Sequence, residues 1–188
     1  MHTSTCEFER GFVAEGRIRL FSLYVDYAAA ERARWVTSQI ARLVGGHWKT
    51  STEIWNLDLL TTASEPMRKM IPQEATEADV LVVALSSLDR REVELVQWLN
   101  SLIAGESKSP VSQLFIGLLG DEEHLAGELE WTVEQFLRCA QRMNRDFIWR
   151  WMEPEAIADS DWLVDSVAAL LNRKQHACDV TFWQEAVQ

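Results

Sequence analysis

The sequence has little of what builds a disulfide-linked or metal-centred protein. Its three cysteines, Cys6, Cys139 and Cys178, are odd in number, lie far apart and form no Cys-x-x-Cys pair. This spacing indicates neither a disulfide framework nor a zinc knuckle, so we expect reduced thiols and no bound metal. Cys139 falls on the packed side of a predicted helix and is expected to be a core residue. No two of the four histidines have metal-ligand spacing: His2, His47, His124 and His176.

Basic residues are also scarce, with 18 Lys and Arg against 29 Asp and Glu and a formal net charge of −11. Nucleic-acid binding needs clustered cations that displace the counterions of the phosphates, so this balance argues against nucleic acids and against anionic membranes. No apolar run reaches the ~18 residues of a membrane span. Residues 1–16 carry Glu7, Glu9 and Arg10 where a signal peptide would be apolar. The sequence therefore predicts a soluble, cytoplasmic protein.

Apolar residues, by contrast, are abundant: they make up 47% of the 188 residues, and the chain has only 4 prolines. This composition is sufficient for the core of one folded domain. Short apolar runs typical of strands alternate with segments of helical period. VLVVAL at 80–85 and LFIGLL at 114–119 are apolar throughout, which is typical of strands covered on both faces. The five predicted strands cover 18–25, 47–55, 80–85, 114–119 and 147–151, of which the second and fifth alternate like edge strands.

Strands that alternate with helices give right-handed crossovers and a parallel sheet covered on both faces. We therefore predict an α/β fold, a three-layer sandwich with a five-stranded parallel sheet in the flavodoxin-like order 2-1-3-4-5, because the most apolar strands belong at the centre. The domain is predicted over 17–173, with an N-terminal arm at 1–16 and a C-terminal tail at 174–188.

The helix faces follow from apolar spacings of three and four. In the first helix one face is predicted to pack while the arginines, Arg32 among them, stay in water. The segment 61–72 contains two prolines and is predicted to be mostly turn, with room for a short helix. A later helix is predicted to begin at Asp89, with Glu92 completing a capping box. Its predicted buried stripe is Val93, Val96, Leu99 and Ile103.

In a sheet of this order, the loops at the carboxyl ends of the strands meet in a crevice where ligands bind. The residues that follow the predicted strands are acidic or hydroxylic. Two interpretations are open: they cap helices, because Asp and Ser are favoured at helix starts, or they hold a hard cation such as Mg²⁺ through oxygen ligands. The candidate crevice residues are Asp26, Tyr27, Ser86, Ser87, Asp121 and Glu153.

The loop after the first strand lacks glycine. It reads Asp26-Tyr27-Ala28-Ala29, whereas a phosphate cradle needs glycines and free backbone N–H groups at a helix start. Neither a flavodoxin-type nor a P-loop signature is present, so we expect no flavin or nucleoside triphosphate and no other cofactor. The predicted helix start at Ser86-Ser87 stays open to an anion.

Nine tryptophans are many for this length. Two interpretations are open: they fill the core, or some of them anchor a protein partner or a second copy in a homodimer, because Trp is enriched at interface hot spots. The candidate interface residues, near the last strand and the tail, are Trp149, Trp151, Trp162 and Trp183.

The five-fold β/α pattern, with Leu23-Tyr24-Val25-Asp26 leading into Ala30-Glu31-Arg32-Ala33, resembles a bacterial response-regulator receiver domain. The resemblance implies an acidic pair after the first strand, a phosphoacceptor Asp after the third, a Thr or Ser after the fourth and Lys-Pro after the fifth. This chain instead has Asp26-Tyr27, Ser86, Leu119-Gly120 and Glu153-Pro154. The resemblance then implies a degenerate receiver that does not undergo Asp phosphorylation and acts as a non-catalytic signalling or interaction module.

An enzymatic alternative rests on a second resemblance. The segment 78–85, followed by Asp89, Glu92, Glu94 and Trp98, is similar to nucleoside deoxyribosyltransferases and to TIR-like nucleotide hydrolases. In those enzymes carboxylates act on a ribosyl bond, so this resemblance implies that Glu92 or Glu94 reacts. The segments 55–60 and 77–80 are similar to uncharacterised bacterial proteins, which implies no function.

Overall fold

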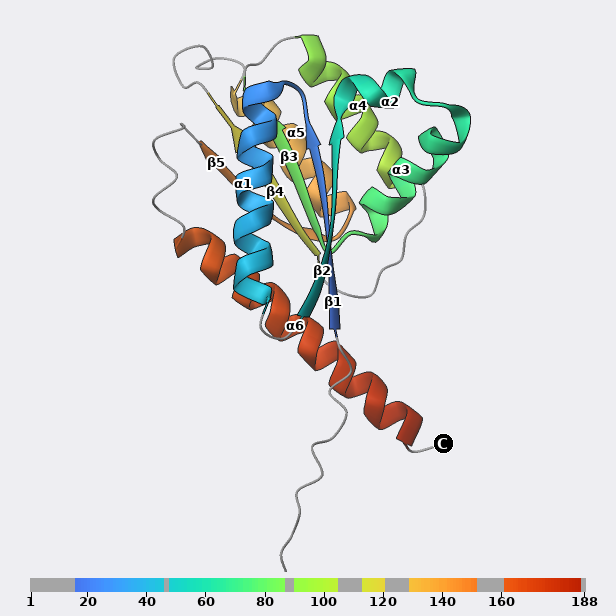
Figure 1. The fold of residues 1–188 in the computed structure, drawn as a ribbon, viewed down its shortest axis with the longest axis vertical. Helices are drawn as coiled ribbons and strands as arrows, with labels where there is room; N and C mark the ends of the chain where they lie inside the picture. Colours follow the sequence, from blue (N-terminus) through green and yellow to red (C-terminus); the bar gives the residue numbers. More distant parts are fainter. Residues whose placement is uncertain are drawn as a thin grey trace, which may run out of the picture.

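A five-stranded sheet lies at the centre of the computed structural model, which describes residues 16–45, 48–86, 90–104, 113–120, 129–151 and 161–186. The strand order is β2-β1-β3-β4-β5, and every neighbouring pair is parallel (Figure 1). The predicted fold class and strand order are therefore confirmed. The strands are β1 (Gly16–Tyr24), β2 (Trp48–Asn56), β3 (Val80–Leu85), β4 (Gln113–Leu119) and β5 (Arg145–Trp151).

The burial of each strand explains the order. Every residue of β3 and β4 is buried, as their unbroken apolar runs predict for strands covered on both faces. Most residues of β2 and β5 are half-buried or exposed, and these two strands form the margins of the sheet. β1 lies between β2 and β3, so the chain moves to one side of β1 through β2 and to the other side through β3.

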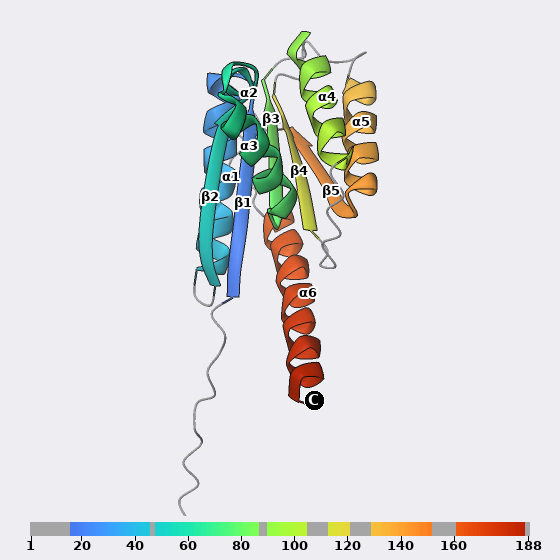
Figure 2. The same ribbon diagram turned by 90° about the vertical axis from the view of Figure 1, so that its right-hand side faces the viewer.

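Helices cover both faces of the sheet, as Figures 1 and 2 show. The helices α1 (Tyr27–Val44) and α6 (Asp161–Ala186) pack on one face. On the other face lie α2 (Leu57–Thr62), α3 (Glu65–Glu77), α4 (Arg90–Ala104) and α5 (Leu129–Arg142). The helix α6 extends beyond the end of the sheet in both views, and residues 174–186 of the predicted tail belong to it. Among the described helices, none is long and apolar enough to cross a membrane.

The faces of two helices differ from the prediction. Arg32 is buried on the packed face of α1, and Leu43, which the apolar spacings of three and four assign to that same face, is exposed. In α4 the buried stripe is shifted, because Val93 is exposed while Glu92 is buried. The two buried charges share one source of error. The prediction left Arg32 in water and used Glu92 as a cap, although the helical period places each of them beside buried neighbours. The buried apolar residues of α4 are Leu95, Val96, Leu99 and Leu102.

A 13-residue helix, α3, begins inside the segment predicted as turns, 61–72, and extends beyond it. Pro66 occupies its first turn, where a missing N–H is harmless, but Pro72 lies inside the helix and removes a backbone donor there. Ile71 and Ala75 are both fully buried against the sheet, and their packing offsets this loss. Tertiary burial therefore overrides the local effect of proline at this place.

Candidate functional site

The candidate crevice lies where the connections from β1 and β3 leave the carboxyl edge of the sheet in opposite directions. Ligands of such sheets bind at this switch point. Asp26 follows β1 and caps α1, since its Oδ1 accepts a hydrogen bond from the Ala29 backbone N–H at 2.9 Å. Ser86 follows β3 and lies beside Asp26. The sequence therefore predicted correctly that residues after these two strands come together.

Two hydrogen bonds join Asp26 to Ser86. The Ser86 hydroxyl donates to Asp26 Oδ1 at 2.5 Å, and the Ser86 backbone N–H donates to Oδ2 at 3.2 Å. With the bond from Ala29, both oxygens of the carboxylate accept hydrogen bonds from the chain itself. The N-terminus of α1, which favours an anion, is therefore already occupied by the Asp26 carboxylate.

Arg32 closes the crevice from α1. Its Nη1 donates to Ser86 Oγ at 2.9 Å and lies 3.5 Å from the Leu85 carbonyl oxygen. The guanidinium packs against Gly120, just after β4, so closely that a Cβ at this glycine would lie 2.2 Å from Arg32 Cζ. We call Asp26, Arg32, Ser86 and Gly120 the switch-point cluster. It links the ends of β1, β3 and β4 with the first turns of α1.

The electrostatics of the cluster keep Asp26 ionised. Burial raises the pKa of its carboxyl group, but the hydrogen bonds from Ser86 and Ala29, together with the charge of Arg32, outweigh burial and lower this pKa below its ordinary value of 3.8. A carboxylate with a lowered pKa is a poor general base at neutral pH. The cluster is thus suited to hold three strand ends together, and it is poorly suited to accept a proton or an anion.

The remaining crevice candidates do not join this cluster within the described residues. Tyr27 begins α1 and is 78% exposed, so it does not line the crevice. Ser87, Asp121 and Glu153 lie outside the described residues, so their predicted positions stay predictions. Within the described part of the chain, no three His, Cys, Asp or Glu side chains are grouped so that they could hold a metal ion.

Arg32 is the site residue that the sequence reading missed. It lies three residues after Ala29 and four before Val36, both of which are buried, so the helical spacing placed it on the packed face. This spacing is the signal that could have identified it.

Another arginine, Arg91 in the first turn of α4, supports the same edge. Its Nη1 donates to the Val25 carbonyl oxygen at 2.9 Å and lies 3.4 Å from Asp58 Oδ2. Glu92 beside it is 5% exposed, whereas Glu94 is exposed. The two glutamates of the enzymatic alternative therefore lie on different faces of α4.

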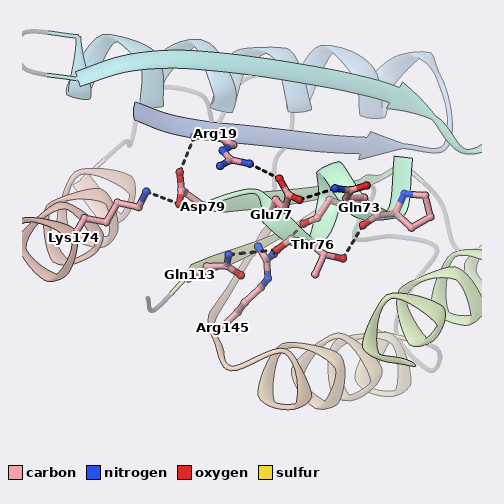
Figure 3. Close-up of polar contacts among 10 residues, drawn as sticks. Arg19, Gln73, Thr76, Glu77, Asp79, Gln113, Arg145 and Lys174 are labelled. Atoms are coloured by element: carbon pink, nitrogen blue, oxygen red, sulfur yellow. Dashed lines mark hydrogen bonds and ion pairs between the residues drawn. The ribbon is translucent and has the colours of Figure 1, made fainter. Parts of the chain in front are cut away.

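A second polar network, which the sequence did not predict, lies at the amino edge of the sheet (Figure 3). Arg145, the first residue of β5, is 6% exposed, and its Nη2 donates to the carbonyl oxygens of Ala75 at 2.9 Å and Thr76 at 3.1 Å. The Gln113 side chain also donates to the Thr76 carbonyl, at 3.4 Å. These bonds cap the C-terminus of α3. No partner for Arg145 Nε or Nη1 is found among the described residues.

Asp79 organises the rest of this network. Its Oδ2 accepts a hydrogen bond from the Arg19 backbone N–H at 2.8 Å, and its Oδ1 pairs with Lys174 Nζ at 2.5 Å. Burial lowers the pKa of Arg145 to about 10, against the charge of Asp79, which raises it. Through its ion pair with the buried Asp79 carboxylate, Lys174 fixes α6 to the start of β3.

The candidate interface residues lie on β5 and at the start of α6. Trp149 and Trp151 are half-buried, and their rings meet edge to face with centroids 6.0 Å apart. On the opposite face of β5, the Arg150 guanidinium lies 5.4 Å from the ring centre of Trp162. Trp183 is on the far part of α6, and its side chain lies outside the described residues. All of the described tryptophans here combine partial burial with partial exposure.

Comparison with known proteins does not identify a family. No protein-family model matches the chain, and no curated protein matches it. Among solved structures it is similar to an oxidoreductase from Corynebacterium diphtheriae, with 11% identity and a TM-score of 0.47 over 70% of this chain and 78% of that one. It is also similar to the apo form of the NADH:FMN oxidoreductase EMOB, with 11% identity and a TM-score of 0.47 over 82% and 87%. Both likenesses are too distant to indicate what this chain binds or catalyses.

Proposed function

We propose that this chain is a non-catalytic, receiver-like module that signals through protein contacts and does not undergo Asp phosphorylation. The observation that carries the proposal is the closed switch-point cluster. Both Asp26 oxygens accept hydrogen bonds from the chain, and Arg32 donates to the Ser86 hydroxyl. A crevice filled in this way holds the fold together at the place where related architectures bind ligands.

Phosphoryl chemistry is disfavoured by the same geometry. Ser86 stands where the receiver resemblance requires a carboxylate nucleophile. Its hydroxyl proton is directed to a carboxylate of lowered pKa, which is a weak base, and the negative charge of Asp26 faces any incoming phosphoryl group. Transfer to Ser86 would require the Asp26 and Arg32 contacts to break first.

The aromatic residues of β5 and α6 supply the surface for protein contacts. Trp149 and Trp151 are partly exposed on one face of β5, and Trp162 is partly exposed beside Arg150 on the other face. Trp and Arg are the residues that most often dominate binding at protein interfaces. This surface lies at the margin of the sheet, away from the switch-point cluster between β1 and β3.

Incubation with acetyl phosphate and Mg²⁺, followed by intact-mass measurement, tests the proposal. We expect the mass to stay unchanged. A gain of one phosphoryl group that disappears in Ser86→Ala or Asp26→Asn, and persists in the exposed α4 control Ser101→Ala, would overturn the non-catalytic assignment.

A second candidate function is cleavage of a ribosyl bond, as in the enzymes to which the α4 region is similar. The observation that favours it is the burial of Glu92 in the first turn of α4, near the carboxyl edge of the sheet. Buried carboxylates in such places often serve as reacting groups. Glu94 is exposed on the same helix and offers a matched control.

Base release from NAD or a deoxynucleoside, followed by chromatography, separates the two functions. The non-catalytic module releases no free base above the buffer blank. Release that is lost in Glu92→Gln and kept in Glu94→Gln would establish the enzymatic function and refute the module.

A further inference from the structure

The strand β5 has an open side. It pairs with β4, and within the described residues no strand pairs with its other side, so a row of backbone N–H and C=O groups faces outward along seven residues. Figure 2 shows β5 at the margin of the sheet. An edge of this length can accept a further strand.

The residues of β5 are arranged symmetrically about Ile148. Asp146 precedes it by two positions, Arg150 follows it by two, and both are exposed. Side chains alternate along a strand, so these two share the face that carries α6. If a second β5 ran antiparallel beside the first, with Ile148 opposite Ile148, Asp146 of each copy would lie opposite Arg150 of the other.

The opposite face of β5 matches itself in the same register. Phe147 would lie opposite Trp149 of the second copy, which gives two aromatic cross-strand pairs, and such pairs stabilise antiparallel sheets. We propose that β5 pairs with β5 of a second copy around a two-fold axis at Ile148, which joins the two sheets edge to edge. This inference rests on the proposed interaction function and names a partner for it.

The charges of β5 favour a second copy over an unrelated partner. Charged residues on an edge strand often prevent pairing, but that role requires no symmetric placement. Here one acid and one base flank the central residue at equal distance, so the two-fold axis of an isologous interface at Ile148 brings opposite charges together. Asp146 already pairs with Arg173 and Arg150 with the Trp162 ring, so both side chains are held on the face where the cross-pairs form.

The other open edge, β2, provides the comparison. Lys49 and Glu53 lie at equal distances from Ser51, but the residues between them are Thr50, Ser51 and Thr52, which offer little apolar area. β5 has Phe147, Ile148 and Trp149 at the equivalent positions. Apolar area is the main favourable term in association, so β5 is the preferred edge.

Charge reversal tests the register of the pairing. The chain and its variants are measured by sedimentation over a range of concentrations, and circular dichroism checks that each is folded. We expect a dimer whose dissociation constant rises at least about ten-fold in Asp146→Arg and in Arg150→Asp, because each places like charges opposite one another. A mixture of the two single variants should form a heterodimer, since every cross-pair is then again opposite in sign.

Controls make the outcome decisive. Lys49→Glu on β2 and Asp165→Arg on the exposed side of α6 should leave the dimer unchanged. Any one of four results would overturn the pairing. The natural chain could be monomeric at every concentration, or its dimer could be insensitive to both charge reversals on β5. The mixture of the two folded variants could stay monomeric, or Lys49→Glu could abolish the dimer. None of these results bears on phosphorylation, so the two proposals fail separately.

Discussion

At the carboxyl edge of the sheet, buried Arg32 donates to the Ser86 hydroxyl, which in turn donates to the Asp26 carboxylate. At the amino edge, buried Arg145 donates to two backbone carbonyls, and within the described residues its Nε and Nη1 have no partner. Both edges thus depend on an arginine with less than a tenth of its surface exposed. At the carboxyl edge a serine side chain links the arginine to a carboxylate, whereas at the amino edge the arginine donates its hydrogen bonds to backbone carbonyls.

This difference shows that a polar group at a strand end is not by itself evidence of a ligand site. The amino edge lies away from the crevice where such sheets bind ligands, yet within the described residues it carries an extensive network of polar contacts (Figure 3). Its task is mechanical: Arg145 caps α3, and Asp79 fixes α6 through Lys174. By the same standard, the switch-point cluster is a structural link between strands.

The largest expected effect is at the amino edge. Arg145→Ala leaves the carbonyl oxygen of Ala75 without its donor and opens a cavity, so it should lower the free energy of unfolding by about 3 kcal/mol. Arg145→Met fills most of the volume and removes a desolvated charge, so it should cost about 1–2 kcal/mol. Urea unfolding measures both. If Arg145→Met lowered the free energy of unfolding as much as Arg145→Ala, the charge of Arg145 itself would be what stabilises this edge.

The features of the fold that a short segment records were predictable from the sequence, whereas contacts between residues far apart in the chain were harder to predict. VLVVAL and LFIGLL placed β3 and β4 at the centre because full burial leaves an unbroken apolar run. Asp26 and Ser86 were correctly brought together because each directly follows a central strand. The amino-edge network joins residues 70 positions apart, such as Arg145 and Ala75, and no local pattern records such a contact.

The errors in helix phase have one physical cause. Arg32 was assigned to water and Glu92 to a helix cap. Burying an isolated charge is expensive. That cost falls when partners are supplied by the tertiary structure, as Ser86 and the Leu85 carbonyl do for Arg32. Helical period can be read from one segment, whereas the partners of a buried charge come from other segments.

A second prediction tests the carboxyl edge. Asp26→Ala removes the cap of α1 and both bonds to Ser86, so it should lower the free energy of unfolding by about 2 kcal/mol. Asp26→Asn keeps an oxygen that accepts from Ala29 and should cost roughly half as much. Glu65→Ala, which breaks an exposed pair with Lys69, is the control and should cost less than about 0.5 kcal/mol. An Asp26→Ala protein as stable as this control would show that the cluster does not hold the strands together.

Gly120 offers a smaller and more specific probe of the same cluster. A methyl group at this position would lie 2.2 Å from Arg32 Cζ, so Gly120→Ala should displace the guanidinium from Ser86 and cost about 1 kcal/mol. The effect should shrink when Arg32 is already Met, because the displaced group is then absent. A double-mutant cycle measures this coupling. Equal costs in both backgrounds would mean that the glycine is needed for a reason other than Arg32.

The smallest expected effect separates the two edges by their response to acid and salt. The pKa of Asp26 is lowered in the folded state, so its contribution to stability is present above its ordinary pKa of 3.8 and is lost as the pH falls through the folded value. Hydrogen bonds from Gln73 and Arg19 also lower the pKa of Glu77 at the amino edge, but its side chain is 42% exposed. Salt screens exposed charges far more than partly buried ones. Urea midpoints measured from neutral to acidic pH should therefore fall less steeply in Ser86→Ala than in the natural chain, and high salt should leave this difference in place. Any difference in the pH dependence between Glu77→Gln and the natural chain should disappear in high salt. If high salt abolished the Ser86→Ala difference as well, Asp26 would be as open to solvent as Glu77, and the switch-point cluster would not be closed.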